Sequence, residues 1–124
     1  MKQLIFILLL AGIATSTHAQ SAEWKELDDY HKVMASTFHP SEEGNLQPIK
    51  ERSGELADKA KALQKSTIPA AYQKPGVKES LDLLAKESKA LDKMVRKKKP
   101  DADITKSLTA LHERFHEVIE KCHH

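Results

Sequence analysis

The sequence predicts an all-α protein, an antiparallel up-down-up-down four-helix bundle, and three observations lead to that prediction. Four segments carry apolar residues spaced three and four positions apart. Short stretches with Pro, Gly or Asn separate these segments. β-branched residues nowhere alternate with polar ones as a half-buried strand requires. Helices of about 15 to 21 residues with short connections pack at shallow crossing angles.

An export signal is expected to precede the bundle. The chain starts with the basic Met1-Lys2-Gln3, continues with an apolar run from Leu4 to Ala14, and reaches the small-residue pattern Thr17-His18-Ala19. This order is typical of a secretory signal. We therefore expect residues 1–19 to be a signal peptide and residues 20–124 to be an exported domain, periplasmic or secreted. The apolar run is too short for a comfortable membrane span and nothing comparable follows it, so we expect no span in the mature chain.

The charge balance bears on the kind of partner, and the cysteine content bears on what holds the domain together. Of 20 Lys and Arg residues only Lys2 lies in the signal, so 19 basic residues face 18 acidic ones in the mature domain. A balance near zero argues against a nucleic-acid partner. The single Cys122 excludes an intramolecular disulfide. The domain must therefore be held together by its core or by a ligand.

The first helix is expected to follow Ser21, which can cap it, and to end near His39, because Pro40 disfavours helical geometry in the residue before it. Residues 41–46 are expected to form a loop. A histidine interrupts the inward row of this helix, which consists of Trp24, Leu27, His31, Met34 and Phe38.

The second helix is expected to begin at Pro48, a residue suited to a first helical turn. Gly54 lowers its intrinsic stability by about 1 kcal/mol, so it depends on its neighbours. Residues 66–76, with two prolines and a glycine, must be a connection. The inward row of this helix consists of Ile49, Ser53, Leu56, Ala60 and Leu63.

The third helix is expected over Val77–Lys97, and its basic end suits the negative end of the helix dipole. Leu83 and Met94 are expected to support its inward row, which consists of Val77, Leu81, Leu84, Ser88, Leu91 and Val95. Asp101 or Asp103 is expected to cap the fourth helix after Pro100. The inward row of the fourth helix consists of Ile104, Leu108, Leu111, Phe115, Val118 and Cys122.

Three histidines are the candidate metal ligands. His112 and His116 are four residues apart on one helix, which lets two imidazoles reach one cation. If the turns near residues 39 and 101 lie at the same end of the bundle, residues of the first and fourth helices lie side by side where their numbers sum to about 140. His31 then lies about one turn from His112. We therefore expect His31, His112 and His116 to hold Zn(II), Cu(II) or Ni(II), with Asp28 or Glu117 able to close the site.

Other candidate ligands are less well placed. His39 lies about 12 Å beyond His31 along a helix, too far to share its ion, and is expected in a loop, where a second site with Glu42 or Glu43 is the alternative. Cys122 and His123 at the frayed end leave three options open: a soft or borderline metal, a disulfide between two copies in a homodimer, or inert packing.

The layout resembles that of the exported four-helix cytochromes, cytochrome c-prime and the soluble b-type bundle. The likeness rests on the signal, four helices, the Pro-containing connection Lys65-Ser66-Thr67-Ile68-Pro69 and a histidine-bearing fourth helix. It implies a periplasmic bundle that binds haem and carries electrons, with His116 as the nearest analogue of the haem ligand. Ile119 stands where the C-x-x-C-H motif has its first Cys, so attachment through two thioethers is excluded.

The sequence therefore predicts a bundle that binds a transition metal for storage, buffering or delivery. A haem-binding electron carrier is one alternative. A non-catalytic envelope module, chaperone-like and bound to a protein partner, is another. We do not expect an enzyme, although residues 112–116 read H-E-x-x-H, in which Glu113 would activate water in a metalloprotease.

Overall fold

The computed structural model describes residues 23–123, which form four α-helices and no strand. The helices are α1 (Lys25–Glu42), α2 (Gln47–Lys65), α3 (Val77–Arg96) and α4 (Asp101–His123). A short 3₁₀ helix, η1 (Ala70–Tyr72), lies in the connection between α2 and α3. The predicted fold class is confirmed. The signal peptide, the Ser21 cap and His124 lie outside the described residues.

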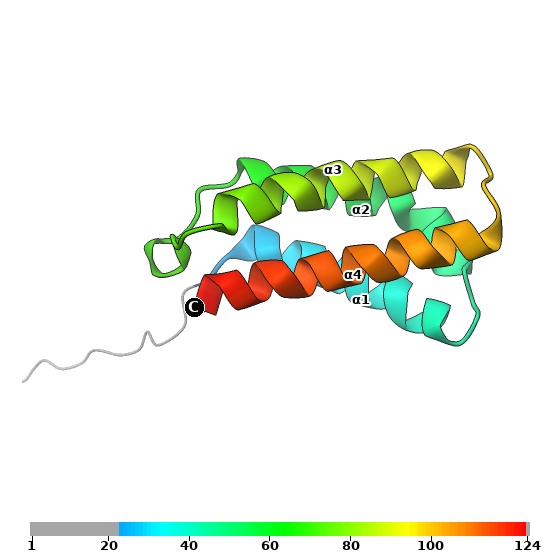
Figure 1. Cartoon of the computed structure of the whole chain (residues 1–124), viewed down its shortest axis with the longest axis horizontal. Coiled ribbons are helices and arrows are strands. Elements are labelled where there is room, and N and C mark those ends of the chain that lie inside the picture. Colours follow the sequence, from blue (N-terminus) through cyan, green and yellow to red (C-terminus); the bar gives the residue numbers. More distant parts are fainter. Residues whose placement is uncertain (1–22, 124) are drawn as a thin grey trace, which may run out of the picture.

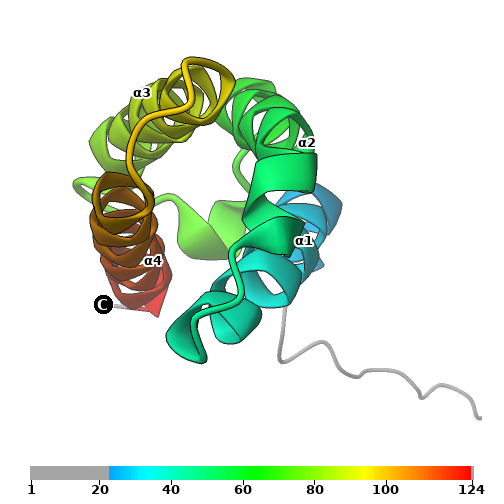
Figure 2. The same ribbon diagram turned by 90° about the vertical axis from the view of Figure 1, so that its right-hand side faces the viewer.

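The four helices form a closed ring in which each helix packs against the next, and α4 returns to α1. Figure 1 shows the α2–α3 connection at one end of the bundle and the α1–α2 and α3–α4 connections at the other. Viewed end-on in Figure 2, the helices follow one another around a common centre. The first and last helices are therefore neighbours, as an up-down-up-down bundle requires. Within residues 23–123, no helix is long and apolar enough to cross a membrane.

The inward rows predicted for α2 and α4 are confirmed residue for residue. In α3 the row is buried from Val77 to Leu91, whereas Val95 is only partly buried. Leu83 does not support the core, because 38% of its surface is exposed. Polar residues take up part of the remaining interior of α3, and Ser80 and Asp92 are both buried.

The inward face of α1 differs from the prediction. His31 is exposed and Leu27 only partly buried, whereas Tyr30, Val33 and Thr37 are buried. The predicted row took two positions in every seven, as in a coiled coil, whereas a helix in a globular bundle buries a stripe of about three in seven. The bulky Tyr30 ring occupies the centre of that stripe. His31, the next residue, is consequently displaced to the edge between α1 and α4.

The predicted end of the first helix at His39 is also wrong. Helix α1 continues through Pro40 to Glu42. Pro40 lies in the last turn, where its carbonyl oxygen still accepts hydrogen bonds from the backbone N–H groups of Glu43 and Asn45, both at 3.0 Å. Gly44, with φ of 86°, then turns the chain. His39 is therefore part of the same rigid helix as His31, and not part of a loop.

Candidate metal centre

Four histidines meet at a cavity between α1 and α4, which we call the histidine pocket. Its volume is about 240 Å³. Each of the two helices contributes two imidazoles. The residues that line the histidine pocket are His31, Met34, Ala35, His39, His112, Phe115 and His116.

Helix α4 is shifted along α1 relative to the predicted level. The Tyr30 ring contacts the Phe115 ring at a centroid distance of 5.2 Å, and the Phe38 ring contacts that of His112 at 3.7 Å. These pairs lie more than one turn away from the expected register, and the extension of α1 beyond His39 to Glu42 accounts for only part of that difference. As a result His31 lies at the level of Phe115 and His116, and His39 comes to the level of His112.

His112 and His116 form the closest part of the site. Their Nε2 atoms are 3.3 Å apart, and their rings stand nearly perpendicular, at 82°. In a tetrahedral site with Zn–N bonds of about 2.0–2.1 Å, two nitrogen ligands are separated by about 3.3–3.4 Å. The two Nε2 atoms are within hydrogen-bond distance of each other, and this separation also equals one edge of such a tetrahedron.

The His112 ring is held in place by an aromatic wall. It stacks on the buried Phe38 ring with an interplanar angle of 6°. Burial lowers the pKa of His112, and the neighbouring His116 lowers it further, while Glu42 opposes the shift. This shift favours the neutral imidazole of His112, and neutral imidazole is the form that binds a metal.

The two histidines of α1 stand at the rim of the pocket. His31 is exposed and rests against Phe115 at a centroid distance of 5.4 Å. His39 is exposed, and its Nδ1 lies 3.4 Å from Oε1 of Glu42. When Nδ1–H donates to a carboxylate, Nε2 is left free for a metal. Glu42 is therefore positioned to set the tautomer of His39.

Ala35 explains why there is room between these histidines. It lies on α1 four residues from His31 and four from His39, and it lines the pocket with a single methyl group. Both imidazoles are one turn from it and flank the space opposite the His112–His116 pair. His31 and His39 remain two turns, about 12 Å, apart along α1, as their eight-residue spacing predicts, so both line one pocket without being placed to share one ion.

The candidate ligands do not surround a single point. Among residues 23–123, no three His, Cys, Asp or Glu side chains stand together as a ready-made metal cage. The two imidazoles of α4 lie close together, and a third candidate ligand would approach them only after rotation of an exposed imidazole from α1. Exposed side chains change rotamer on the picosecond to nanosecond timescale.

Ion pairs on the far side of α4 fix its orientation. The Arg114 guanidinium donates two hydrogen bonds to the Glu87 carboxylate on α3, both at 2.9 Å. Oε1 of Glu117 accepts hydrogen bonds from Arg114 at 3.0 Å and from Ser80 at 3.2 Å. Glu117 is therefore committed to α3 rather than to the histidine pocket, and Asp28 does not line the pocket either.

The other candidate residues lie away from the pocket. Cys122 is buried, and burial raises the pKa of its thiol. The His123 ring stands edge-on to the Tyr72 ring at a centroid distance of 5.8 Å. Glu113, the acidic residue of the H-E-x-x-H stretch, is exposed and does not line the pocket.

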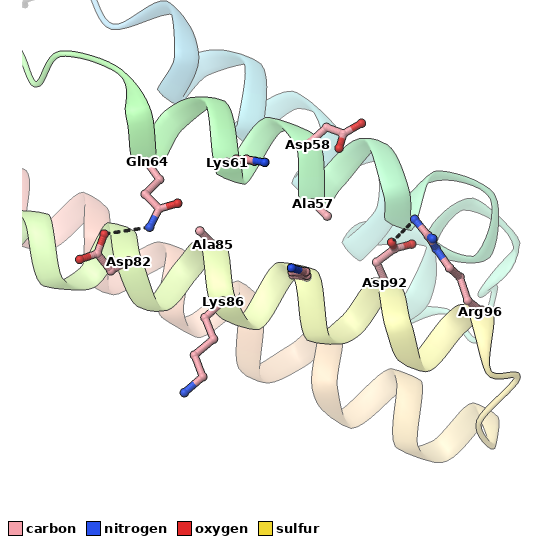
Figure 3. Close-up of a pocket in the computed structure, with 10 residues that line it drawn as sticks. Ala57, Asp58, Lys61, Gln64, Asp82, Ala85, Lys86, Asp92 and Arg96 are labelled. Atoms are coloured by element: carbon pink, nitrogen blue, oxygen red, sulfur yellow. Dashed lines mark hydrogen bonds and ion pairs between the residues drawn. The ribbon is translucent and has the colours of Figure 1, made fainter.

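A larger groove of about 470 Å³ lies between α2 and α3, and two pairs of its polar side chains contact each other. Figure 3 shows Gln64 of α2 reaching Asp82 of α3, at 3.0 Å, and Arg96 paired with Asp92, at 2.6 Å. The buried Asp92 also accepts a hydrogen bond from Ser53 at 2.8 Å. No histidine is among the residues that line this groove.

Comparison of the chain with family models, with curated proteins and with solved structures finds no match. The function must therefore be inferred from the pocket itself.

Proposed function

We propose that this protein is an exported transition-metal-binding bundle, which binds Zn(II), copper or Ni(II) for storage, buffering or delivery. The ligands are His112 and His116 from α4 and His31 from α1, whereas His39 lines the same pocket about 12 Å from His31 along α1. The observation that carries the proposal is the 3.3 Å separation of the Nε2 atoms of His112 and His116 in a pocket that two further histidines line.

The residue types and their surroundings support a binding role. Imidazole suits Zn, Cu and Ni, and the site offers nitrogen ligands from two helices. The lowered pKa of His112 keeps it ready to bind at neutral pH. A metal held this way joins the first and last helices of the chain, so binding stabilises the whole bundle.

Isothermal titration with Zn(II) tests the proposal. We expect one ion per chain, and we expect His116→Gln to weaken binding at least about tenfold, as loss of a metal-site group does. His116 is exposed, so this change leaves the core intact. His123→Gln is the matched control, because it removes a histidine of the same helix outside the pocket. Equal affinity in the wild type and His116→Gln would refute the ligand assignment.

Ligand protonation provides a second test. Because the imidazoles must be deprotonated to bind, affinity should weaken steeply below about pH 6. Binding that is independent of pH between 5 and 8 would point to carboxylate ligands and contradict the proposal.

A further inference from the structure

Met34 lies at the floor of the histidine pocket. Only 1% of its surface is exposed, although it lines the cavity. The pocket therefore has a sulfur-bearing residue at its base, while the exposed His31, His39 and His116 and the half-buried His112 stand at its mouth. Phe115 forms part of its wall.

A thioether discriminates among metals in a way that imidazole does not. Zn(II) in proteins is bound by thiolate, imidazole and carboxylate. Thioether sulfur is a soft ligand that favours Cu(I), whereas imidazole suits zinc, copper and nickel alike. Carboxylates, which suit harder ions, are absent from the residues that line this pocket. A donor set of neutral imidazoles and one thioether, with an apolar wall, matches copper best.

We propose that Met34 is a copper ligand, and that Cu(I), bound by Met34 together with His112 and His116, is the preferred ion of this site. This inference rests on the proposed function, because it assigns the metal of the same pocket.

Comparison of two metals on two variants tests the assignment. Met34→Leu keeps the volume and apolar character of the side chain and removes the sulfur. Met94→Leu is the matched control, because Met94 is a partly buried methionine of α3 that does not line the pocket. Cu(I) is supplied anaerobically in competition with a chromophoric Cu(I) chelator, and Zn(II) is titrated calorimetrically.

We expect Met34→Leu to weaken Cu(I) binding at least about tenfold and to leave Zn(II) affinity unchanged, while Met94→Leu changes neither. A second readout uses the protein without substitution: on addition of Ag(I), a redox-inert substitute for Cu(I), the methyl carbon resonance of Met34 should shift and that of Met94 should not. If the wild type binds Zn(II) and its Cu(I) affinity equals that of Met34→Leu, the proposed role of Met34 is wrong, while the proposed function stands. Binding of neither metal to the wild type overturns the proposed function as well.

Discussion

The hydrogen bond between Tyr30 and Ser88 offers a quantitative test of the core that supports the pocket. The Tyr30 hydroxyl and Oγ of Ser88 are 2.8 Å apart, and neither residue has any exposed surface. Burial also raises the pKa of Tyr30 above its ordinary value. The Tyr30 ring packs on Phe115, which in turn contacts His31, so this bond helps to fix the wall of the histidine pocket.

Tyr30→Phe removes the phenol oxygen and leaves the shape of the ring unchanged. The Ser88 hydroxyl is then buried without its partner, which costs about 1–3 kcal/mol of unfolding free energy. For a domain of about 100 residues this lowers Tm by about 4–8 °C for each kcal/mol. Ser88→Ala leaves the Tyr30 hydroxyl without its partner and should cost a similar amount.

Urea unfolding of the wild type, both single variants and the double variant measures the coupling. Each single variant leaves one hydroxyl buried without a partner, and the double variant leaves none. We therefore expect the double variant to be more stable, by about 0.5–3 kcal/mol, than the sum of the two single losses implies. Strict additivity of the two substitutions would show that the two hydroxyls do not interact, and the packing described for this part of the core would be wrong.

Three further predictions concern the pocket. Zn(II) at a hundredfold excess over Kd should raise the unfolding free energy by about 2.7 kcal/mol and Tm by about 10–20 °C; an unchanged thermal melt would contradict this. Ala35→Leu should fill the pocket and abolish Zn(II) binding in calorimetry while every histidine remains; undiminished binding would place the metal elsewhere. The pKa of His112 is lower in the folded protein than in the unfolded chain, so the unfolded chain binds a proton at higher pH. The unfolding free energy of the metal-free protein should therefore be greatest above about pH 6.5 and decrease as the pH falls below that value. Denaturant titrations from pH 5 to 8 should show this fall, and His112→Gln should reduce it.

The sequence predicted the fold because four amphipathic periods agree with one architecture. The rows of α2 and α4 each have a single dominant apolar face, so their buried residues could be identified one by one. In α1 two faces competed, because a row through His31 and one through Tyr30 are both largely apolar. Packing against the rest of the bundle decides between them, since Tyr30 contacts Ser88 of α3 and Phe115 of α4.

The site was only partly predictable for the same reason. The spacing of His112 and His116 gave the pair directly. The placement of His39 depended on whether α1 crosses Pro40, and local propensity favoured a stop there. Packing of the last turn, with Phe38 and Ser41 buried, overrides that preference. The export signal, the choice of metal and the haem alternative stay predictions.

The proposed function requires histidines from α1 and α4 to bind one metal ion together. This requirement can be checked with proton–nitrogen correlation spectra of the imidazole rings during titration with Zn(II). We expect the ring nitrogen resonances of His31, His112 and His116 to shift together and reach their end point at one equivalent, while those of His123 do not move. Resonances of His112 and His116 that stay in place at saturating Zn(II), or that shift without those of His31, would contradict it.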